Sequence, residues 1–423
     1  MAKFLVQKSA PLKGEVTISG AKNAVLPILA ATLLTEDKCI IKETPALRDV
    51  NFMCRILESF GAEVTDKLED SIVEVEARNI VTTEADFDLV RKMRASSLVM
   101  GPLVARTGSA IIPLPGGCAI GKRPIELHLK GLRALGVQIE EGEGHQGPLV
   151  CKADKLVGAD IYLDFPSVGA TEVIMMAATL AEGVTIIENA AQEPEIVDLA
   201  NFMNKMGARI KGAGTAIIKI EGVEKLHGVK HHVIPDRIEA GTFMVAAAMT
   251  KGQILIKNIL PDHVKPVTAK LRECGAEIYM TDEGMVVRGD VNPIISTDIK
   301  TLPYPGFPTD MQSPFMALLT VSKGPSVVME TVFENRFMHV AEFNRMGANI
   351  KTDGNCALIP GGKKLQGAQV VATDLRAGAA LILTGLVAEG TTEISDIYHI
   401  DRGYEKIVDK FRGLGATIIR IED

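Results

Sequence analysis

A single cysteine lies in a loop whose composition suits chemistry on a small substrate. Residues 113–124 read PLPGGCAIGKRP, with Cys118 near the centre and Lys122 and Arg123 after it. Nearby positive charge favours the thiolate and would make Cys118 reactive, whereas a small inert cysteine is the alternative. The glycine and lysine spacing approaches that of a nucleotide-binding P-loop. However, Arg123 stands where a Ser or Thr would hold magnesium, and we reject that interpretation.

A second candidate is an aspartate at the start of a predicted helix. Residues 304–312 read YPGFPTDMQ, and the prolines stiffen the approach to Asp310. At a helix start the carboxylate would serve as an N-cap for the backbone amides. It would instead serve as a general base if its site were desolvated and a substrate hydroxyl were within reach. The residues alone leave both interpretations open.

Cations in separate segments would suit an anionic ligand if the fold brought them together. Lys22 and Asn23 stand at the point where a predicted strand is followed by an apolar helix. Helix N-termini attract anions, so these residues could bind one. The alternative is a turn with a solvated lysine. Singly, an arginine is usually a solvated charge or a surface ion pair. As a convergent set, guanidinium groups would bind a compact carboxylate or phosphate. Five arginines lie beside small residues or an aspartate: Arg94, Arg123, Arg336, Arg376 and Arg402.

The elements that must position these groups repeat along the whole chain. A helix-like stretch that ends in glycine, followed by a small or branched residue and an apolar strand, occurs six times, at Gly61, Gly136, Gly207, Gly275, Gly347 and Gly415. An alanine-rich helix, usually followed by a glycine turn and a β-branched strand, precedes each copy, as in residues 176–187, 244–256 and 381–394. Six such units predict an α/β protein of two domains with three units each, and a boundary near residues 231–235.

Composition excludes several classes of protein. The chain has 423 residues, of which 47% are hydrophobic and 23% charged, which is a normal soluble mixture. Its net charge of −7 argues against a nucleic-acid or membrane-surface protein. We expect no signal peptide and no membrane span. The six cysteines are scattered without metal-ligand spacing, which favours free thiols in a reducing cytoplasm.

Six segments resemble the UDP-N-acetylglucosamine 1-carboxyvinyltransferases, a family of enolpyruvyl transferases in the EPSP synthase superfamily. The resemblance follows the order of that family's motifs along essentially the whole chain. The segments are SGAKNA (19–24), GGCAIG (116–121), FPTDMQ (307–312), ENRF (334–337), DLRA (374–377) and HIDRGY (399–404).

The resemblance implies a fold and a division of the chain. The family's fold is the two-domain αβ prism, an inside-out α/β barrel that some schemes class as α+β, built from six repeated αβ units. One domain would span residues 22–234 and carry the Cys118 loop. The other would combine residues 1–21 with 235–423 and carry Asp310. The active site would lie in the interdomain cleft.

The resemblance also implies the reaction. The enolpyruvyl group of phosphoenolpyruvate passes to the 3-hydroxyl of UDP-N-acetylglucosamine, and a tetrahedral intermediate releases phosphate. Cys118 takes the position of the general acid, which can also form a covalent adduct, and Asp310 takes the base or hydroxyl-orienting position. Lys22 and Arg402 complete the catalytic set. The phosphoenolpyruvate set is Lys22, Asn23, Arg123, Arg336, Arg376 and Arg402. No cofactor and no metal are implied.

A further set of positions matches the family's sugar-nucleotide site. It comprises Asn23, Arg94, Arg123, Pro124, Ile125, Glu126, Leu127, Ser167, Val168, Gly169, Asp310 and Val332. Two residues depart from the best-known enterobacterial pattern. Phe165 stands where that pattern has a lysine near the diphosphate, and Glu126 replaces an aspartate near the uracil. These departures concern nucleotide affinity and leave the reaction class unchanged.

The resemblance places the chain in the cytoplasm, at the first committed step of peptidoglycan synthesis, and so in cell-wall biogenesis, cell shape, the cell cycle and division. It also implies alkylation of Cys118 by the epoxide fosfomycin. Two alternatives remain. The shikimate-pathway enolpyruvyl transferase is disfavoured by Cys118 and by the absence of its own phosphate-binding pattern. A non-catalytic nucleotide-binding paralogue is disfavoured because Cys118, Asp310 and five clamp cations are all retained.

Overall fold

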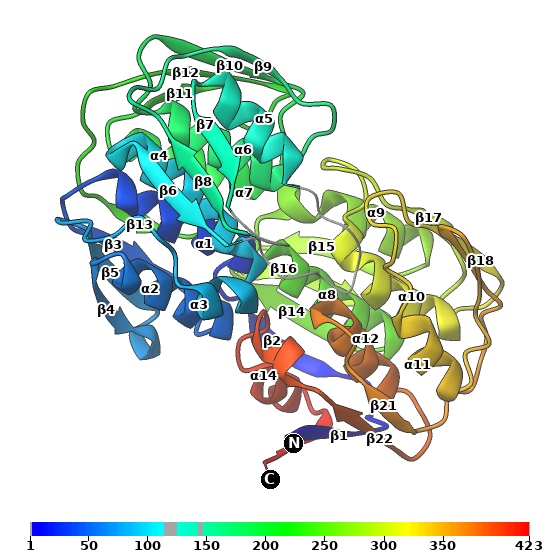
Figure 1. Ribbon diagram of the computed structural model, residues 1–423. Helices are drawn as coiled ribbons and strands as arrows, with labels where there is room; N and C mark the ends of the chain where they lie inside the picture. The colour runs from blue at the N-terminus through cyan, green and yellow to red at the C-terminus, as the bar shows by residue number, and fades with distance from the viewer. Residues whose placement is uncertain (1, 114–124, 143–146, 423) are drawn as a thin grey trace. The chain divides into compact units, whose positions relative to one another are not determined.

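The computed structural model describes residues 2–113, 125–142 and 147–422, without the side chains of residues 91, 92 and 94 (Figure 1). The chain divides into two compact units. The first unit consists of the described residues between 20 and 234, and the second unit of residues 2–19 and 235–422. Each unit has its own hydrophobic core.

The first unit contains three sheets and the helices that pack on them. One sheet has the order β13 (Lys230–His232), β3 (Cys39–Lys42), β5 (Ile72–Glu76), β4 (Glu63–Lys67). The others are β6 (Ser109–Ile112), β8 (Leu149–Lys152), β7 (Gln138–Glu141), and β11 (Arg209–Lys211), β12 (Ile217–Glu221), β10 (Val184–Glu188), β9 (Asp160–Tyr162). The helices are α1 (Lys22–Ala31), α2 (Arg48–Ser59), α3 (Phe87–Lys92), the 3-10 helix η3 (Arg94–Val99), α4 (Met100–Thr107), α5 (Glu126–Ala134), α6 (Val168–Ala178) and α7 (Pro194–Lys205).

The second unit has the same construction. Its sheets are β21 (Gln369–Val371), β22 (Thr391–Ser395), β1 (Lys3–Gln7), β23 (Thr417–Ile421); β15 (Glu277–Thr281), β16 (Gly284–Arg288), β14 (Gln253–Lys257), β2 (Lys13–Thr17); and β17 (Ile299–Lys300), β18 (Ser326–Met329), β20 (Cys356–Ile359), β19 (Lys351–Asp353). Its helices are α8 (Arg237–Met249), α9 (Lys265–Glu273), the 3-10 helix η5 (Thr309–Met311), α10 (Gln312–Val321), α11 (His339–Arg345), α12 (Leu375–Gly385), α13 (Tyr398–Asp401) and α14 (Ile407–Gly413).

Strand pairing follows one pattern in five of the six sheets of the described residues. An edge strand runs parallel to its neighbour, and the remaining pairs are antiparallel. In the sheet of β6, β8 and β7 a single parallel bridge between Glu84 and Ile111 takes the place of that edge strand. Strands distant in sequence complete three of the sheets, and in one of them β2 is the edge strand beside β14. β13 pairs with β3, and β1 lies between β22 and β23, with Leu5 opposite both Glu393 and Ile419.

The predicted glycine repeats are confirmed. The six glycines follow α2, α5, α7, α9, α11 and α14, and their φ angles lie between +91° and +104°. At the last copy the Gly415 amide donates to Arg412 O (2.9 Å) and the Ala416 amide to Phe411 O (3.0 Å). The same two bonds recur at the other five copies. This Schellman ending satisfies the last helix carbonyls and needs a left-handed residue, which explains the glycine.

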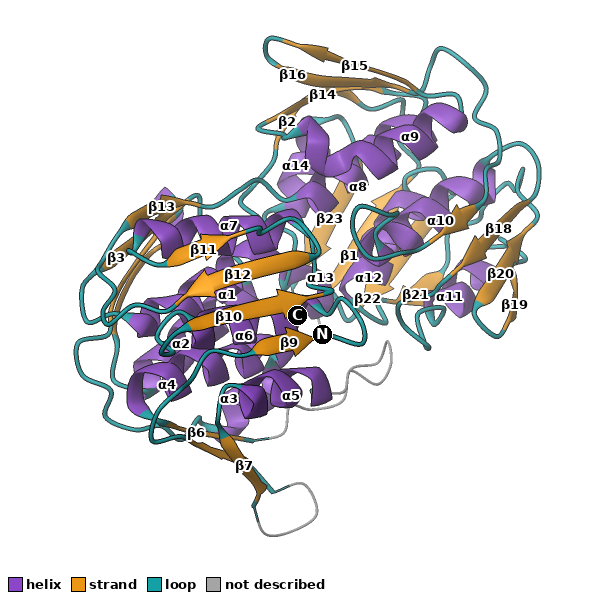
Figure 2. Cartoon of the chain, turned by 90° about the horizontal axis from the view of Figure 1, so that it is seen from above, coloured by secondary structure: helices purple, strands orange, loops and turns teal. Residues whose placement is uncertain are grey.

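In each unit the sheets lie on the outside and the helices between them, as Figure 2 shows. The alanine-rich helices therefore have no solvent face, and twelve of the thirteen residues of α8 are buried. In the second unit α8, α10 and α12 pack against one another. Small and apolar side chains let these helices approach closely, and the glycine turns after α6, α8 and α12 return the chain to β10, β14 and β22 as predicted.

Candidate active site

Asp310 lies between two arginines of the second unit. Its Oδ1 accepts from Nη2 of Arg336 at 2.7 Å, and its Oδ2 accepts from Nη2 and Nε of Arg376 at 3.0 and 3.2 Å. Both guanidinium groups are buried, and the carboxylate side chain retains 26% of its exposure. The three residues come from the start of η5 and α10, the turn after β18, and the first turn of α12. The fold thus brings together three of the predicted site residues.

The charges at this cluster keep the carboxylate ionised. Burial by itself would raise the pKa of Asp310, but the charges of Arg376 and Arg336, and their hydrogen bonds, outweigh burial and hold that pKa well below its usual range. Nη1 of Arg376 is buried and has no hydrogen-bond acceptor in the part of the chain that the structure describes. The guanidinium of Arg376 also lies over the Tyr404 ring, 5.3 Å from its centre.

Two of the sequence interpretations are wrong here. Asp310 is not an N-cap, because its two oxygens accept hydrogen bonds from arginines and the helix it belongs to has no side-chain cap. The helix-capping aspartate nearby is Asp374, whose carboxylate accepts from the amides of Arg376 and Ala377. Arg336 and Arg376 are not surface charges either, since tertiary packing buries them against Asp310.

Two polar residues that sequence reasoning missed support the cluster. The Thr309 hydroxyl accepts from Nη1 of Arg336 at 2.8 Å and donates to Oε2 of Glu330 at 2.9 Å. Glu330 follows β18 and is 2% exposed. Thr309 precedes Asp310 in the chain and was therefore within the recognised motif, but nothing local to Glu330 distinguishes it from a surface glutamate.

Arg402 lies in the same unit, at the end of α13, which packs against α12. The neighbouring Asp401 pairs bidentately with Arg420, at 2.8 and 3.0 Å. In the sequence Asp401 directly precedes Arg402. Its ion pair with Arg420 on β23 shows that its carboxylate helps to fix α13 to the neighbouring sheet.

Lys22 and Asn23 occupy the first turn of α1 in the first unit, as predicted. Nζ of Lys22 lies 2.8 Å from Oδ2 of Asp49, in an ion pair whose side chains are 12% and 2% exposed. Asp49 stands in the first turn of α2 and carried no sequence signal, because its partner is determined by the packing of α1 on α2.

The sugar-nucleotide candidates of the first unit gather at two helix starts. Ile125 is the N-cap of α5, which begins with Glu126 and Leu127. The hydroxyl of Ser167 caps α6 by accepting from the Ala170 amide at 3.4 Å, and Val168 and Gly169 are the first residues of that helix.

The two helices pack against each other, and a Cβ added at Gly169 would lie 2.7 Å from Nε2 of His128. A larger residue at position 169 would require the His128 side chain to shift. Phe165 is 42% exposed just before this helix start.

Four of the predicted site residues are not among the side chains that the structure describes. Cys118, Arg123 and Pro124 lie outside the described residues, as does the side chain of Arg94, whose backbone begins η3. Val332 belongs to the second unit, and its amide donates to Oε1 of Glu330 at 2.8 Å.

Comparison with known proteins assigns the family. The family model described as EPSP synthase (3-phosphoshikimate 1-carboxyvinyltransferase) matches residues 6–411. UDP-N-acetylglucosamine 1-carboxyvinyltransferase 1 of Caldanaerobacter subterraneus is 61% identical over 99% of both chains. UDP-N-acetylglucosamine 1-carboxyvinyltransferase 2 of Carboxydothermus hydrogenoformans is 58% identical over the whole of both. The chain belongs to the UDP-N-acetylglucosamine 1-carboxyvinyltransferase family.

Solved structures confirm the predicted fold for this member of the UDP-N-acetylglucosamine 1-carboxyvinyltransferase family. The enolpyruvyl transferase NikO from Streptomyces tendae superposes with a TM-score of 0.89 at 24% identity, covering 99% of this chain and 98% of that one. EPSP synthase from Acinetobacter baumannii gives a TM-score of 0.76 at 18% identity over both full chains. At these identities the likeness concerns the fold alone.

Four of the five thiols that the structure describes in this carboxyvinyltransferase family member are poorly suited to catalysis. Cys39, Cys54, Cys151 and Cys274 are buried, and Cys356 is half-buried. Burial raises the pKa of the first four thiols to about 11 or 12. These thiols are neutral at physiological pH and react slowly with electrophiles.

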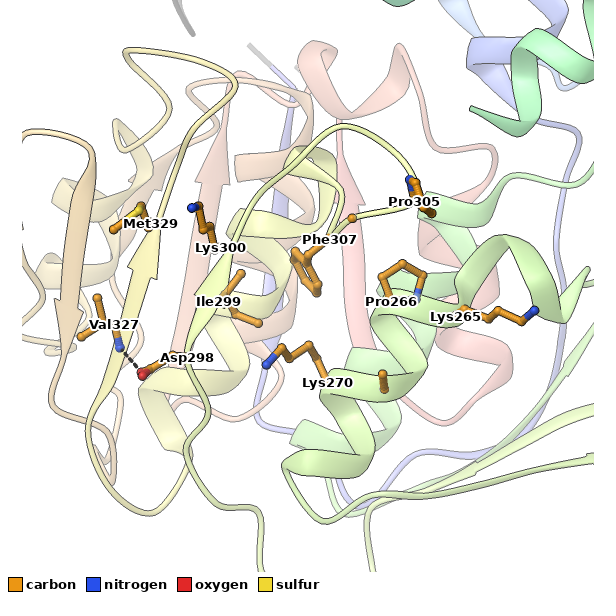
Figure 3. Close-up of a pocket in the computed structure, with 12 residues that line it drawn as sticks. Lys265, Pro266, Lys270, Asp298, Ile299, Lys300, Pro305, Phe307, Val327 and Met329 are labelled. Carbon is orange, nitrogen blue, oxygen red and sulfur yellow. Dashed lines mark hydrogen bonds between the residues drawn. The ribbon is translucent and has the colours of Figure 1, made fainter. Parts of the chain in front are cut away.

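The second unit also has an open pocket of about 730 Å³ (Figure 3). Apolar residues, including Ile299, Phe307 and Met329, form much of its wall. The charged groups around it are largely engaged within the protein. Lys265 pairs with Asp262, Lys270 pairs with Glu273, and the carboxylate of Asp298 accepts from the Val327 amide. Among the described residues, none of the predicted site residues lines this pocket.

The described residues limit the class of site in two ways. They hold no group of three His, Cys, Asp or Glu side chains arranged for a metal ion. None of their helices combines the length and the apolar character needed to cross a bilayer.

Proposed function

We propose that this protein transfers the enolpyruvyl group of phosphoenolpyruvate to the 3-hydroxyl of UDP-N-acetylglucosamine, with release of phosphate. The observation that carries the proposal is the identity of 55 to 61% to curated enzymes of that name over essentially full length. The Asp310 cluster supports it, because buried guanidinium groups around a carboxylate are what a reaction of a hydroxyl with a phosphorylated acid needs.

In this proposal the second unit supplies the base and part of the anion clamp. The ionised Asp310 accepts a hydrogen bond from the 3-hydroxyl and orients it. Nη1 of Arg376 offers a buried donor to phosphoenolpyruvate. An arginine that turns from Asp310 toward the substrate anion leaves the carboxylate with less counter-charge. The pKa of Asp310 then rises, and the carboxylate becomes a stronger base when substrate is bound.

The remaining roles follow the family positions. We propose that Cys118 protonates the methylene carbon and that Lys22, Asn23, Arg123 and Arg402 complete the phosphoenolpyruvate site. The sugar nucleotide is proposed to bind at the starts of α5 and α6, with Arg94, Pro124 and Val332. The ion pair with Asp49 supports this role for Lys22, because it fixes the ammonium group at the N-terminus of α1.

The test is phosphate release from phosphoenolpyruvate with two acceptors, UDP-N-acetylglucosamine and shikimate 3-phosphate. We expect release with the sugar nucleotide alone and its loss in Asp310→Ala. The matched control is Asp290→Ala, which removes an exposed aspartate paired with Arg288 in the same unit and should retain activity. Release with the shikimate compound alone would reassign the acceptor. Nucleotide binding without turnover would favour the non-catalytic paralogue.

We also propose that fosfomycin alkylates Cys118. The thiolate attacks an epoxide carbon, a C–S bond forms, and the opened ring oxygen takes a proton. The four buried thiols should not compete, because their raised pKa values keep them neutral. A Cys356→Ser background removes the half-buried fifth thiol. Intact-protein mass should then increase by one fosfomycin in the presence of UDP-N-acetylglucosamine, and Cys118→Ser should show no increase.

The cellular role is proposed on the same basis. An enzyme with this activity supplies peptidoglycan precursors and so acts in cell-wall biogenesis, shape and division, in the cytoplasm. Depletion of the protein in its host should reduce the pool of enolpyruvylated UDP-N-acetylglucosamine before cell shape changes.

A further inference from the structure

Glu330 accepts an unusual number of hydrogen bonds for a residue outside the family positions. Its Oε1 accepts from the Thr301 hydroxyl (2.8 Å) and from the amides of Val332 (2.8 Å) and Phe333 (3.2 Å). Its Oε2 accepts from the Thr309 hydroxyl at 2.9 Å. A carboxylate that is 2% exposed and fully engaged in this way fixes all the groups that donate to it.

The carboxylate also sets the direction of the next hydrogen bond. An ionised carboxylate can only accept, so the Thr309 hydroxyl must give its single hydrogen to Glu330. The lone pairs of Thr309 are then free to accept from Nη1 of Arg336 at 2.8 Å. Nη2 of the same arginine donates to Asp310 at 2.7 Å. The chain of bonds therefore runs from Asp310 through Arg336 and Thr309 to Glu330.

A second contact holds the same arginine from the other side. The turn whose amides donate to Glu330 contains Phe333, and the guanidinium of Arg336 lies 5.2 Å from the centre of the Phe333 ring. Glu330 thus holds Arg336 both through Thr309 and through the turn. The turn also contains Val332, one of the proposed sugar-nucleotide positions.

We propose that Glu330 is a positioning residue. It holds the guanidinium group of Arg336 against Asp310, the proposed base, and links the turn that contains Val332 to the same cluster. This inference rests on the proposed function. Glu330 touches no substrate in it and acts through Thr309 and the turn.

The decisive variant is Glu330→Gln. The amide oxygen can keep the bonds to Thr301, Val332 and Phe333, while an NH₂ donor replaces the acceptor that faces Thr309. The Thr309 hydroxyl must then accept from both the new NH₂ group and Nη1 of Arg336, and its hydrogen bond with Arg336 becomes weaker. We expect kcat to fall roughly tenfold or more, with KM for UDP-N-acetylglucosamine changed less than about threefold. The acid limb of the kcat profile should move to higher pH, because Asp310 loses counter-charge.

Three further variants distinguish positioning from a merely structural role. Thr309→Val should reproduce the effect on kcat, and Thr309→Ser, which keeps the hydroxyl, should restore most of it. Glu342→Gln is the matched control, because Glu342 is a 7% exposed carboxylate of the same unit that accepts from the Val371 amide at 3.1 Å. It should leave kcat and the pH profile unchanged.

The proposal is overturned if Glu330→Gln keeps the parental kcat and pH profile, or if Glu342→Gln shifts both equally. If the parent chain itself shows no turnover, the proposed function fails, but this inference is still tested. The carboxyl ¹³C signal of Asp310, assigned with Asp310→Asn, should titrate at higher pH in Glu330→Gln than in the parent. Identical titration would refute the role of Glu330.

Discussion

Asp310 must carry its charge throughout the neutral range, because two buried arginines share its two oxygens. A carboxylate so paired stabilises the fold and is a weak base at the same time. Both requirements are met if bound phosphoenolpyruvate takes Arg336 or Arg376 away from Asp310, because the carboxylate then becomes a stronger base. The residues of the cluster stand 26 and 66 positions apart in the chain. Sequence motifs could therefore suggest their types and roles, but the pairing itself, and the part played by Glu330, depended on tertiary packing.

This pairing predicts how stability depends on pH. The pKa of Asp310 is lower in the folded chain than in the unfolded chain, so its contribution is complete above the unfolded value, about 4, and disappears as pH falls through the folded value. Asp310→Asn should lower the free energy of unfolding by roughly 2 to 4 kcal/mol. In urea titrations this deficit should be constant from about pH 5 to pH 8. A deficit that shrinks between pH 8 and pH 5 would contradict the low pKa. Asp290→Asn should cost less than about 0.5 kcal/mol.

At the scale of elements, the sequence was most informative where a local rule demands one residue type. A helix that ends in a Schellman turn needs a left-handed residue at a fixed place, and this requirement made six glycines visible about 70 residues apart. For the complementary reason, local rules cannot separate a cap from a base at Asp310. An aspartate near a helix start satisfies the same local pattern whether it bonds amides or distant arginines.

Two glycines near the end of α14 should respond oppositely to alanine. Gly415 has φ +91° and open space where a Cβ would stand, so Gly415→Ala should cost roughly 1 to 2 kcal/mol through backbone strain alone. Gly413 is the last residue of α14 and also has open space around a Cβ, so Gly413→Ala should stabilise by about 0.5 to 1 kcal/mol. Equilibrium unfolding in urea measures both. Equal effects of the two substitutions would contradict this account of the repeat.

At the scale of the whole molecule, each unit is closed by a strand that is remote in sequence. The six repeats indicated three αβ units per domain, but periodicity could not say which strand completes the first and last sheets. β1 supplies the missing strand between β22 and β23, and β13 supplies the edge beside β3. These strands satisfy backbone hydrogen-bonding groups that a sheet edge would otherwise expose, and no local sequence pattern identifies the strand that does so.

The closing strand should carry much of the stability of the second unit. Phe4 is fully buried on β1, and Phe4→Ala should lower the free energy of unfolding by roughly 3 to 5 kcal/mol. Leu5 lies on the opposite face and is half-buried, so Leu5→Thr should cost about 1 kcal/mol. Limited proteolysis of Phe4→Ala should yield first cuts between residues 235 and 422. First cuts within residues 20–234 would contradict this assignment.

The position of β1 has a consequence for how the chain is made. Gln7 bonds Thr391, which is 384 residues later, so β1 leaves the ribosome long before the strands that pair with it. At about 5 to 20 residues per second, β1 waits roughly 20 to 80 s with its backbone unpaired. Residues 20–234 can meanwhile complete all three of their sheets, because β13 arrives with the end of that unit. The nascent chain therefore carries a folded half and an exposed strand together, a state in which binding by a chaperone at residues 3–7 would protect it from aggregation.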